Sequence, residues 1–229
     1  TLKSLEFEVP LFSSVFLFLL IGFYLSKERV KLPENRMFNF ILFFSLVESL
    51  LDTFVHIICA SYPFEIVLRD YYLFIDYSNK ILSLCFAIIF VSYLKYILMI
   101  SDKKFSENEK IVNYCSYLFY FALFLVLQFT HINLIEVNNV TNVTGMTSSI
   151  AYVVVGLCLF ISFVISLPKL KEKDKRYYSV FIITVMLGIA MFLIMLIPGI
   201  IIYDFVLAIM CYVMYFTIEN PDVKMIQEL

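Results

Sequence analysis

Three ionisable residues recur at intervals of four in an apolar stretch of the chain. Glu48, Asp52 and His56 occupy these positions within the segment Val47 to Ala60. Residues at i, i+4 and i+8 lie on one face of an α-helix, so the spacing predicts a stripe of two carboxyl groups and one imidazole. Ionisable groups in an apolar helix are costly when they face lipid, so the stripe indicates a bundle interior or a wet cavity within a membrane.

The chemistry expected of this stripe is proton exchange or ligand binding. Glu48 and Asp52 would be neighbours in a medium of low dielectric, so we expect that they are not both ionised and that they titrate as a coupled pair. His56, nearer the outer mouth, is suited to exchange protons in the physiological range. The stripe predicts a ligand-, proton- or ion-sensing cavity that opens outward. A polar cluster that only fixes helix packing is the main alternative, and conduction or catalysis is a further one.

Other polar residues are candidates to join this site. Asp204 lies about one turn into the last apolar run, Arg69 is the nearest cation in the first outer loop, and Gln128 lies in the outer half of the fourth run. Lys95 is expected to have a different role, as an anchor whose ammonium group reaches the headgroups at the cytoplasmic surface.

The composition of the chain indicates an integral membrane protein. Of its 229 residues, 62% are hydrophobic and 16% are charged, whereas roughly a quarter of the residues of a soluble domain are charged. The net charge of −2 does not suggest a nucleic-acid partner. No metal or cofactor motif is visible in this segment. The cysteines lie in apolar runs without CxxC spacing and are expected to be buried thiols: Cys59, Cys85, Cys115, Cys158 and Cys211.

Seven apolar runs are candidates for membrane helices, each of which needs about 20 residues. They cover residues 10–26, 37–60, 79–101, 111–134, 149–168, 178–197 and 200–218. Pro198 and Gly199 separate the last two runs and predict a tight turn, although one long kinked helix in a six-span protein is the alternative. The predicted fold class is all-α, an integral membrane seven-helix bundle.

Basic residues between the runs predict the orientation. They gather in the loops of one side: Lys27, Arg29, Lys31, Arg36, Lys103, Lys104, Lys110, Lys169, Lys171, Lys173, Lys175, Arg176 and Lys224. By the positive-inside rule the N-terminus is outside and the C-terminus is cytoplasmic. Of the two larger outer loops, residues 61–79 are expected to form an aromatic segment at the membrane interface or a lid, and residues 135–149 a loose polar loop.

The sequence after the last run has the features of a helix start. Asn220 is a favoured N-cap, Pro221 a favoured first residue, and Asp222 an acid where the helix dipole stabilises it. We therefore predict a seven-span sensor domain over residues 1–218 and the start of a cytoplasmic signalling helix over residues 219–229. The three residues named are the candidate signal-transmitting positions.

The segment MYFTIENPDVKMIQEL, Met214 to Leu229, resembles the juncture of multi-pass bacterial sensor histidine kinases, which has the form TIENPD-x-K-x-I-x-EL. In that family a dimerising helical pair with the phosphoaccepting His and an ATP-binding domain follow. The resemblance implies a homodimer of the bacterial cytoplasmic membrane, ATP and Mg²⁺ in a kinase domain beyond this segment, and a cytoplasmic response regulator as partner. No catalytic motif lies in this segment, and the chain, which starts at Thr1 rather than Met, is expected to be a piece of a longer protein.

Two other functions fit the same general features. A cyclase-type output domain could follow the same kind of membrane sensor. A stand-alone transporter would show inverted repeats, helices broken by Gly or Pro, and charges in both halves. The chain has five glycines, and most of its intramembrane charge lies in the second run, so the sensor is the favoured interpretation.

Overall fold

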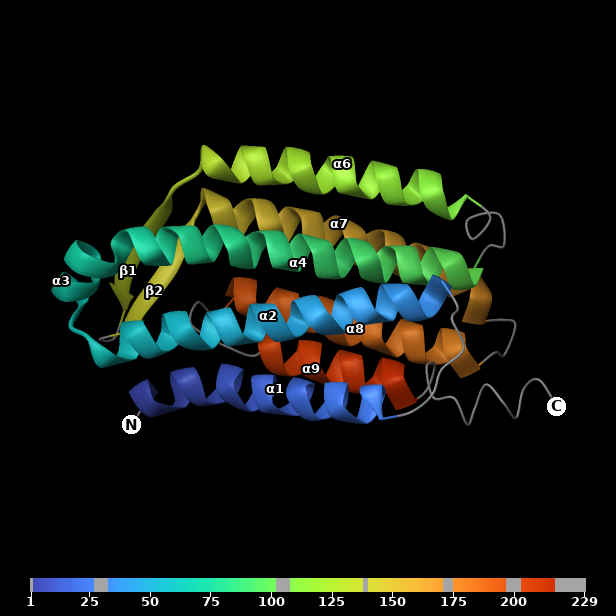
Figure 1. Cartoon of the computed structure of the whole chain (residues 1–229), viewed down its shortest axis with the longest axis horizontal. Helices are drawn as coiled ribbons and strands as arrows, with labels where there is room; N and C mark the ends of the chain where they lie inside the picture. The colour runs from blue at the N-terminus through green and yellow to red at the C-terminus, as the bar shows by residue number, and fades with distance from the viewer. Residues whose placement is uncertain are drawn as a thin grey trace.

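The apolar runs of the sequence form long helices that lie roughly side by side (Figure 1). A helix satisfies its own backbone hydrogen bonds, which makes it the favoured conformation of an apolar segment in lipid. The computed structural model describes residues 2–26, 33–101, 108–137, 140–170, 175–196 and 203–216. Its long helices are α1 (Leu2–Leu25), α2 (Pro33–Ser61), α4 (Tyr72–Ser101), α6 (Glu109–Gln128), α7 (Met146–Lys169), α8 (Lys175–Leu196) and α9 (Tyr203–Met214).

Five of these helices, α1, α2, α4, α6 and α7, are long and apolar enough to cross a membrane. The other two contain shorter apolar segments, Tyr178–Ile194 in α8 and Tyr203–Met214 in α9. These two helices pack side by side through apolar residues such as Ile183 and Leu207, so they do not form one long kinked helix. The predicted turn at Pro198 and Gly199 lies outside the described residues.

Helix α4 is the centre of the bundle. It packs against α2 and α7 and, over a smaller surface, against α6. Its apolar segment is the most buried of the five membrane-length segments, whereas that of α6 is the least buried. The main core contains Phe90, Tyr93 and Tyr96 of α4, and the Tyr93 hydroxyl donates to the backbone oxygen of Val180 in α8 at 3.1 Å.

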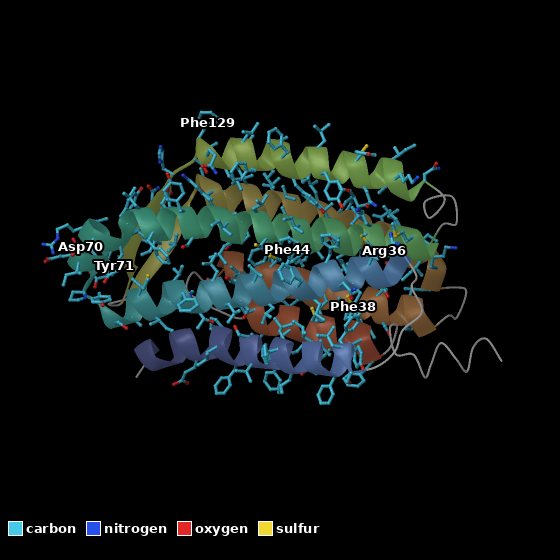
Figure 2. All side chains as sticks on the ribbon, viewed as in Figure 1. Arg36, Phe38, Phe44, Asp70, Tyr71 and Phe129 are labelled. Carbon is cyan, nitrogen blue, oxygen red and sulfur yellow. The ribbon has the colours of Figure 1, made fainter. Side chains whose placement is uncertain are left out.

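The outer surface of the bundle is also apolar. Large hydrophobic side chains that are more than half exposed occur on several helices, among them Phe12, Phe18, Leu118, Phe160 and Phe192. The side chains that project outward from α1 in Figure 2 show the same pattern. Soluble monomers rarely expose apolar surface over such an extent, whereas a helix that is apolar on all sides suits a lipid environment.

The first outer loop forms a short helical cap at one end of the bundle. It consists of α3 (Phe64–Ile66) and the π-helix η1 (Val67–Tyr71), which leads directly into α4. The rings of Tyr62 and Tyr71 stack with centroids 4.9 Å apart. Asp70 and Tyr71 lie at this end, and Arg36 lies toward the opposite end (Figure 2).

The second outer loop is an antiparallel hairpin, not the loose loop that the sequence predicted. Strand β1 (Ile132–Val137) pairs with β2 (Val140–Gly145), with Ile132 opposite Gly145. Gly145 has a φ of +136°, and a Cβ there would lie 2.9 Å from the backbone oxygen of His131. The prediction that the fourth helix continues to residue 134 is also wrong. Helix α6 ends at Gln128, and the chain then turns into the first strand.

The contact that fixes this change of direction is tertiary. The Thr130 hydroxyl lies 2.8 Å from the Leu127 backbone oxygen and 2.8 Å from the Thr147 hydroxyl at the start of α7. The Tyr72 hydroxyl, from the first turn of α4, donates to the Ile132 backbone oxygen at 3.2 Å. The hairpin is therefore tied to three helices at the capped end of the bundle.

Candidate functional site

The predicted stripe lies along α2 on the side that faces the bundle interior. Glu48 is 0% exposed and Asp52 is 4% exposed, whereas His56 is partly buried. The imidazole Nδ1 of His56 lies 3.0 Å from the Asp52 backbone oxygen and 3.2 Å from its Oδ2. The i, i+4, i+8 spacing thus gives a continuous polar line that runs from the bundle interior toward the capped end.

A third carboxyl group comes from the last helix. Asp204, the second residue of α9, is 0% exposed. Its side chain and that of Tyr203 lie within hydrogen-bonding reach of Glu48, and Asp204 also reaches Asp52. Glu48, Asp52 and Asp204 are called the carboxyl cluster below. It joins two helices that are far apart in the sequence.

The cluster cannot hold three negative charges without compensation. In the described part of the chain, no donor is aligned with the carboxyl oxygens of Glu48 or Asp204 at regular hydrogen-bond geometry. An ionised carboxylate only accepts hydrogen bonds, so two carboxyl groups bind each other only if one of them carries a proton. Uncompensated ions in such a site cost several kcal/mol each. The geometry therefore favours carboxyl groups that share protons.

Two tyrosines and a cysteine complete the surroundings of the cluster. Tyr152 of α7 lies close enough to Asp52 for an electrostatic interaction, and Cys85 of α4 has the same relation to Glu48. The Tyr203 ring packs against Phe86 of α4, with centroids 4.9 Å apart. The cluster thus lies where α2, α4, α7 and α9 meet. The described residues contain no group of three or more His, Cys, Asp or Glu side chains that could hold a metal ion.

Small hydroxyl groups extend the polar face of α2 toward α1. The Ser49 hydroxyl lies 2.9 Å from that of Ser14 and donates to the Pro10 backbone oxygen at 3.0 Å. The Thr53 hydroxyl donates to the Ser49 backbone oxygen at 2.7 Å. The sequence reasoning missed these residues. Ser49 and Thr53 directly follow Glu48 and Asp52 and are also four residues apart, so a search for small polar residues at this spacing would have found them.

The last helix also contacts α1 and α2 through polar groups that lie further along α9 than the carboxyl cluster. The Cys211 thiol lies 3.7 Å from the Ser45 hydroxyl of α2. One residue further, the Tyr212 hydroxyl donates to the Phe16 backbone oxygen of α1 at 2.9 Å. Polar contacts therefore link α9 to both neighbours at successive depths.

Two predicted site residues lie elsewhere. Arg69 is exposed in the cap and forms a two-pronged ion pair with Asp70, with distances of 2.7 and 2.9 Å. Gln128 is exposed at the end of α6, a helix that packs mainly against α4. The structure brings neither of them to the carboxyl cluster. The candidate signal-transmitting residues Asn220, Pro221 and Asp222 lie outside the described residues.

Two lysines are more buried than their positions in the sequence predicted. Lys95 is 7% exposed, and its Nζ donates to Asn113 Oδ1 of α6 at 2.6 Å, so it is not an anchor at the membrane surface. The third apolar run was predicted to start at residue 79, which would place Lys80 at its outer end. That helix starts at Tyr72, and Lys80 forms a buried ion pair of 2.8 Å with Asp76 one turn earlier.

Comparison of the chain with protein-family models, with curated proteins and with solved structures gives no match. The resemblance of residues 214–229 to sensor kinases therefore stays a prediction. What the chain does is inferred from that segment and from the geometry of the carboxyl cluster.

Proposed function

We propose that the chain is the membrane-embedded input domain of a two-component sensor histidine kinase. The observation that carries the proposal is the buried contact of Asp204, at the start of α9, with Glu48 and Asp52 of α2. Protonation or ligand binding at this cluster sets the packing of α9 against α2. The seven helices cross the bacterial cytoplasmic membrane with the N-terminus outside, as the loop charges predict.

The electrostatic energy of ionisation at the carboxyl cluster is comparable to the energy needed to shift a helix between two arrangements. Two like charges about 4 Å apart repel by about 4 kcal/mol when the effective dielectric constant is about 20. A change from 1:99 to 99:1 between two helix arrangements needs about 5.5 kcal/mol. One ionisation event at the cluster, together with the hydrogen bond that it breaks, is therefore of the right size to shift α9.

The last helix is the natural output because the kinase-like segment follows it. In the sequence, residues 217–229 follow the helix that carries Asp204, and the resemblance assigns to them the start of a dimerising cytoplasmic rod. In this proposal the protein is a homodimer, its kinase domain binds ATP and Mg²⁺, and its phosphate passes to a response regulator.

The test uses the protein encoded by the complete gene, reconstituted in lipid vesicles with ATP and Mg²⁺. We expect phosphohistidine to form at a rate that changes with external pH or with an added ligand. Glu48→Gln and Asp204→Asn should fix the rate at one level, whereas Asp70→Asn, which changes an exposed carboxyl group of the cap, should respond like the parent. A gene that ends soon after the codon for Leu229, or a protein that forms no phosphohistidine, would exclude the kinase.

The buried carboxyl groups also favour a second candidate, a proton-coupled transporter, because such proteins use carboxyl groups in the membrane interior. Vesicle uptake driven by a proton gradient would identify it. A cyclase output would instead show cyclic nucleotide formation by the complete protein.

A further inference from the structure

The two ends of the stripe on α2 differ in their access to the surroundings. The side chains of Glu48 and Asp204 are 0% exposed, so a water-sized molecule does not touch them in this arrangement. His56, at the other end of the stripe, has 23% of its side chain exposed. It lies about 8 Å from the end of α2 next to the cap, and about 12 Å from Glu48, at 1.5 Å of rise per residue. The stripe therefore joins a closed interior to an accessible end.

Contacts between ionisable side chains connect these two ends. His56 Nδ1 lies 3.2 Å from Asp52 Oδ2. Asp52 lies within hydrogen-bonding reach of Asp204, which in turn reaches Glu48. These four side chains are called the polar line below. Chains of Asp, Glu and His side chains carry protons inside membrane proteins.

The polar line does not continue along α2 toward the end that the loop charges assign to the cytoplasm. In the described part of α2 below Glu48, the buried side chains are Ser45, whose hydroxyl contacts the Cys211 thiol, and then the apolar Leu42, Ile41 and Phe38. Apolar side chains do not carry protons. A line that is open at one end lets protons bind and leave but not cross, which suits a sensor better than a transporter.

We propose that the ligand of the carboxyl cluster is the proton, which enters from the outer face through His56. This inference rests on the proposed function and names its stimulus, the external pH. The described residues contain no group of side chains that could hold a metal ion. A larger ligand would have to touch carboxyl groups that have no exposed surface. A proton needs no cavity, and it replaces the repulsion between two carboxylates with a hydrogen bond.

The imidazole of His56 is suited to this transfer because it has two nitrogens. It can take up a proton at Nε2 and release the proton of Nδ1 to Oδ2 of Asp52. The ring then ends neutral, and the cluster has gained one proton. His56 is the member of the line whose ordinary pKa, about 6.5, lies close to neutral pH.

Other ionisable groups near the polar line are less suited to this role. Cys85 of α4, Tyr152 of α7 and Tyr203 of α9 face the cluster, but thiols and phenols ordinarily ionise only near pH 8.5 and pH 10 respectively. In the first turns of α4, Asp76 and Lys80 pair with each other at 2.8 Å. The carboxyl groups of the cluster therefore remain the acceptors of a proton that His56 delivers.

The experiment follows the carboxyl protons by infrared absorption. The protein encoded by the complete gene is reconstituted in vesicles, and light releases protons from a caged acid on one side of the membrane. We expect the C=O absorption of protonated carboxyl groups to rise, and Glu48→Gln or Asp204→Asn should reduce this rise. His56→Gln should slow it by about 100-fold, the lower end of what a positioned proton-transfer group contributes, and should leave its final amplitude unchanged.

Three comparisons make the result specific. Imidazole added to the solution should restore most of the rate in His56→Ala, whereas a role of His56 in packing alone would not respond to it. His131→Gln, at the other histidine of the chain, changes an exposed side chain and should behave like the parent. With caged acid outside the vesicles, the rise should be confined to molecules whose capped end faces outward, which an impermeant maleimide counts in Arg69→Cys protein.

The inference can fail independently of the kinase proposal because the infrared signal does not depend on phosphohistidine. A rate in His56→Gln equal to that of the parent overturns it, and so does an equally fast rise when the acid is released at the opposite end of the bundle. A carboxyl signal that neither Glu48→Gln nor Asp204→Asn reduces also overturns it. If His56→Gln does not fold, His56→Ala with and without imidazole gives the same comparison.

Discussion

The two sides of the bundle are held together in different ways. On one side, α9 meets α1 and α2 through the carboxyl cluster and through the hydroxyl and thiol groups of Tyr212 and Cys211. On the other side, α6 contacts α4 through a smaller surface and the hydrogen bond of Lys95 with Asn113, and an apolar groove separates it from α7. The first side is buried and polar, and the second is open and mostly apolar.

The two sides depend on different kinds of contact. Lipid tails are as apolar as leucine side chains, so helices in a membrane associate through packing and hydrogen bonds rather than through the hydrophobic effect. The α9 side depends on carboxyl groups, so in the proposed function its packing responds to their protonation. The α6 side depends on the packing of apolar side chains and on the hydrogen bond of Lys95 with Asn113.

The largest expected effect is the pH dependence of the α9 side. Hydrogen bonds between the carboxyl groups of the cluster need shared protons, whereas the same groups in the unfolded chain ionise above about pH 4. We therefore expect the purified protein to lose stability as the pH rises above that value, by up to about 4 kcal/mol for one pair of like charges. The Glu48→Gln/Asp204→Asn variant should lose most of this dependence. The measurement is thermal unfolding in detergent at several pH values.

Other titratable groups that face the cluster must be tested in the same series. They are His56 on α2, Cys85 on α4, Tyr152 on α7 and Tyr203 on α9. His56→Gln should leave the loss between pH 7 and 9 unchanged, and so should Asp70→Asn in the exposed cap. A double variant with the full pH dependence of the parent would show that the cluster is not its origin.

The second effect concerns the α6 side. Asn113→Leu removes the amide that accepts the hydrogen bond of the buried Lys95, and hydrogen bonds to charged groups contribute about 1.5–3 kcal/mol. We expect faster amide hydrogen exchange throughout α6 and little change in α9. Tyr114→Leu, a change at the neighbouring and exposed position, is the matched control. Equal acceleration of hydrogen exchange in α6 and α9 would contradict the conclusion that different contacts hold the two sides of the bundle together.

The sequence predicted the helices and the polar stripe because both depend on local patterns. Apolar runs and the 3–4 spacing of Glu48 and Asp52 are visible without any tertiary information. The depth of Asp204 in the last run also suggested that it could join the stripe, and the structure brings it to Glu48. The spacing of residues within one helix gives no information about Tyr152, which reaches the cluster from α7.

The features that the sequence did not predict depend on contacts between distant residues. The apolar residues after Gln128 fit a helix end as well as a strand, and in the structure residues 132–137 pair with residues 140–145 while Thr130 contacts Thr147 of α7. Arg69 appeared to be a partner for the stripe, but its neighbour Asp70 binds it in the cap. The burial of Lys95 follows from the position of α6, which no local pattern specifies.

The smallest expected effect tests whether hydrogen bonds without charge also hold the polar side together. Ser49→Ala removes the hydroxyl group that binds Ser14 and the Pro10 backbone oxygen. Hydrogen bonds between membrane helices contribute about 0.6 kcal/mol on average and up to about 1.7, so we expect a loss of about 1 kcal/mol in the free energy of unfolding, the same at every pH. Leu50→Ala, a change at an exposed position of α2, is the control in the same unfolding assay. A loss that grows with pH would mean that Ser49 acts through Glu48, and the carboxyl cluster would then extend to the contact with α1.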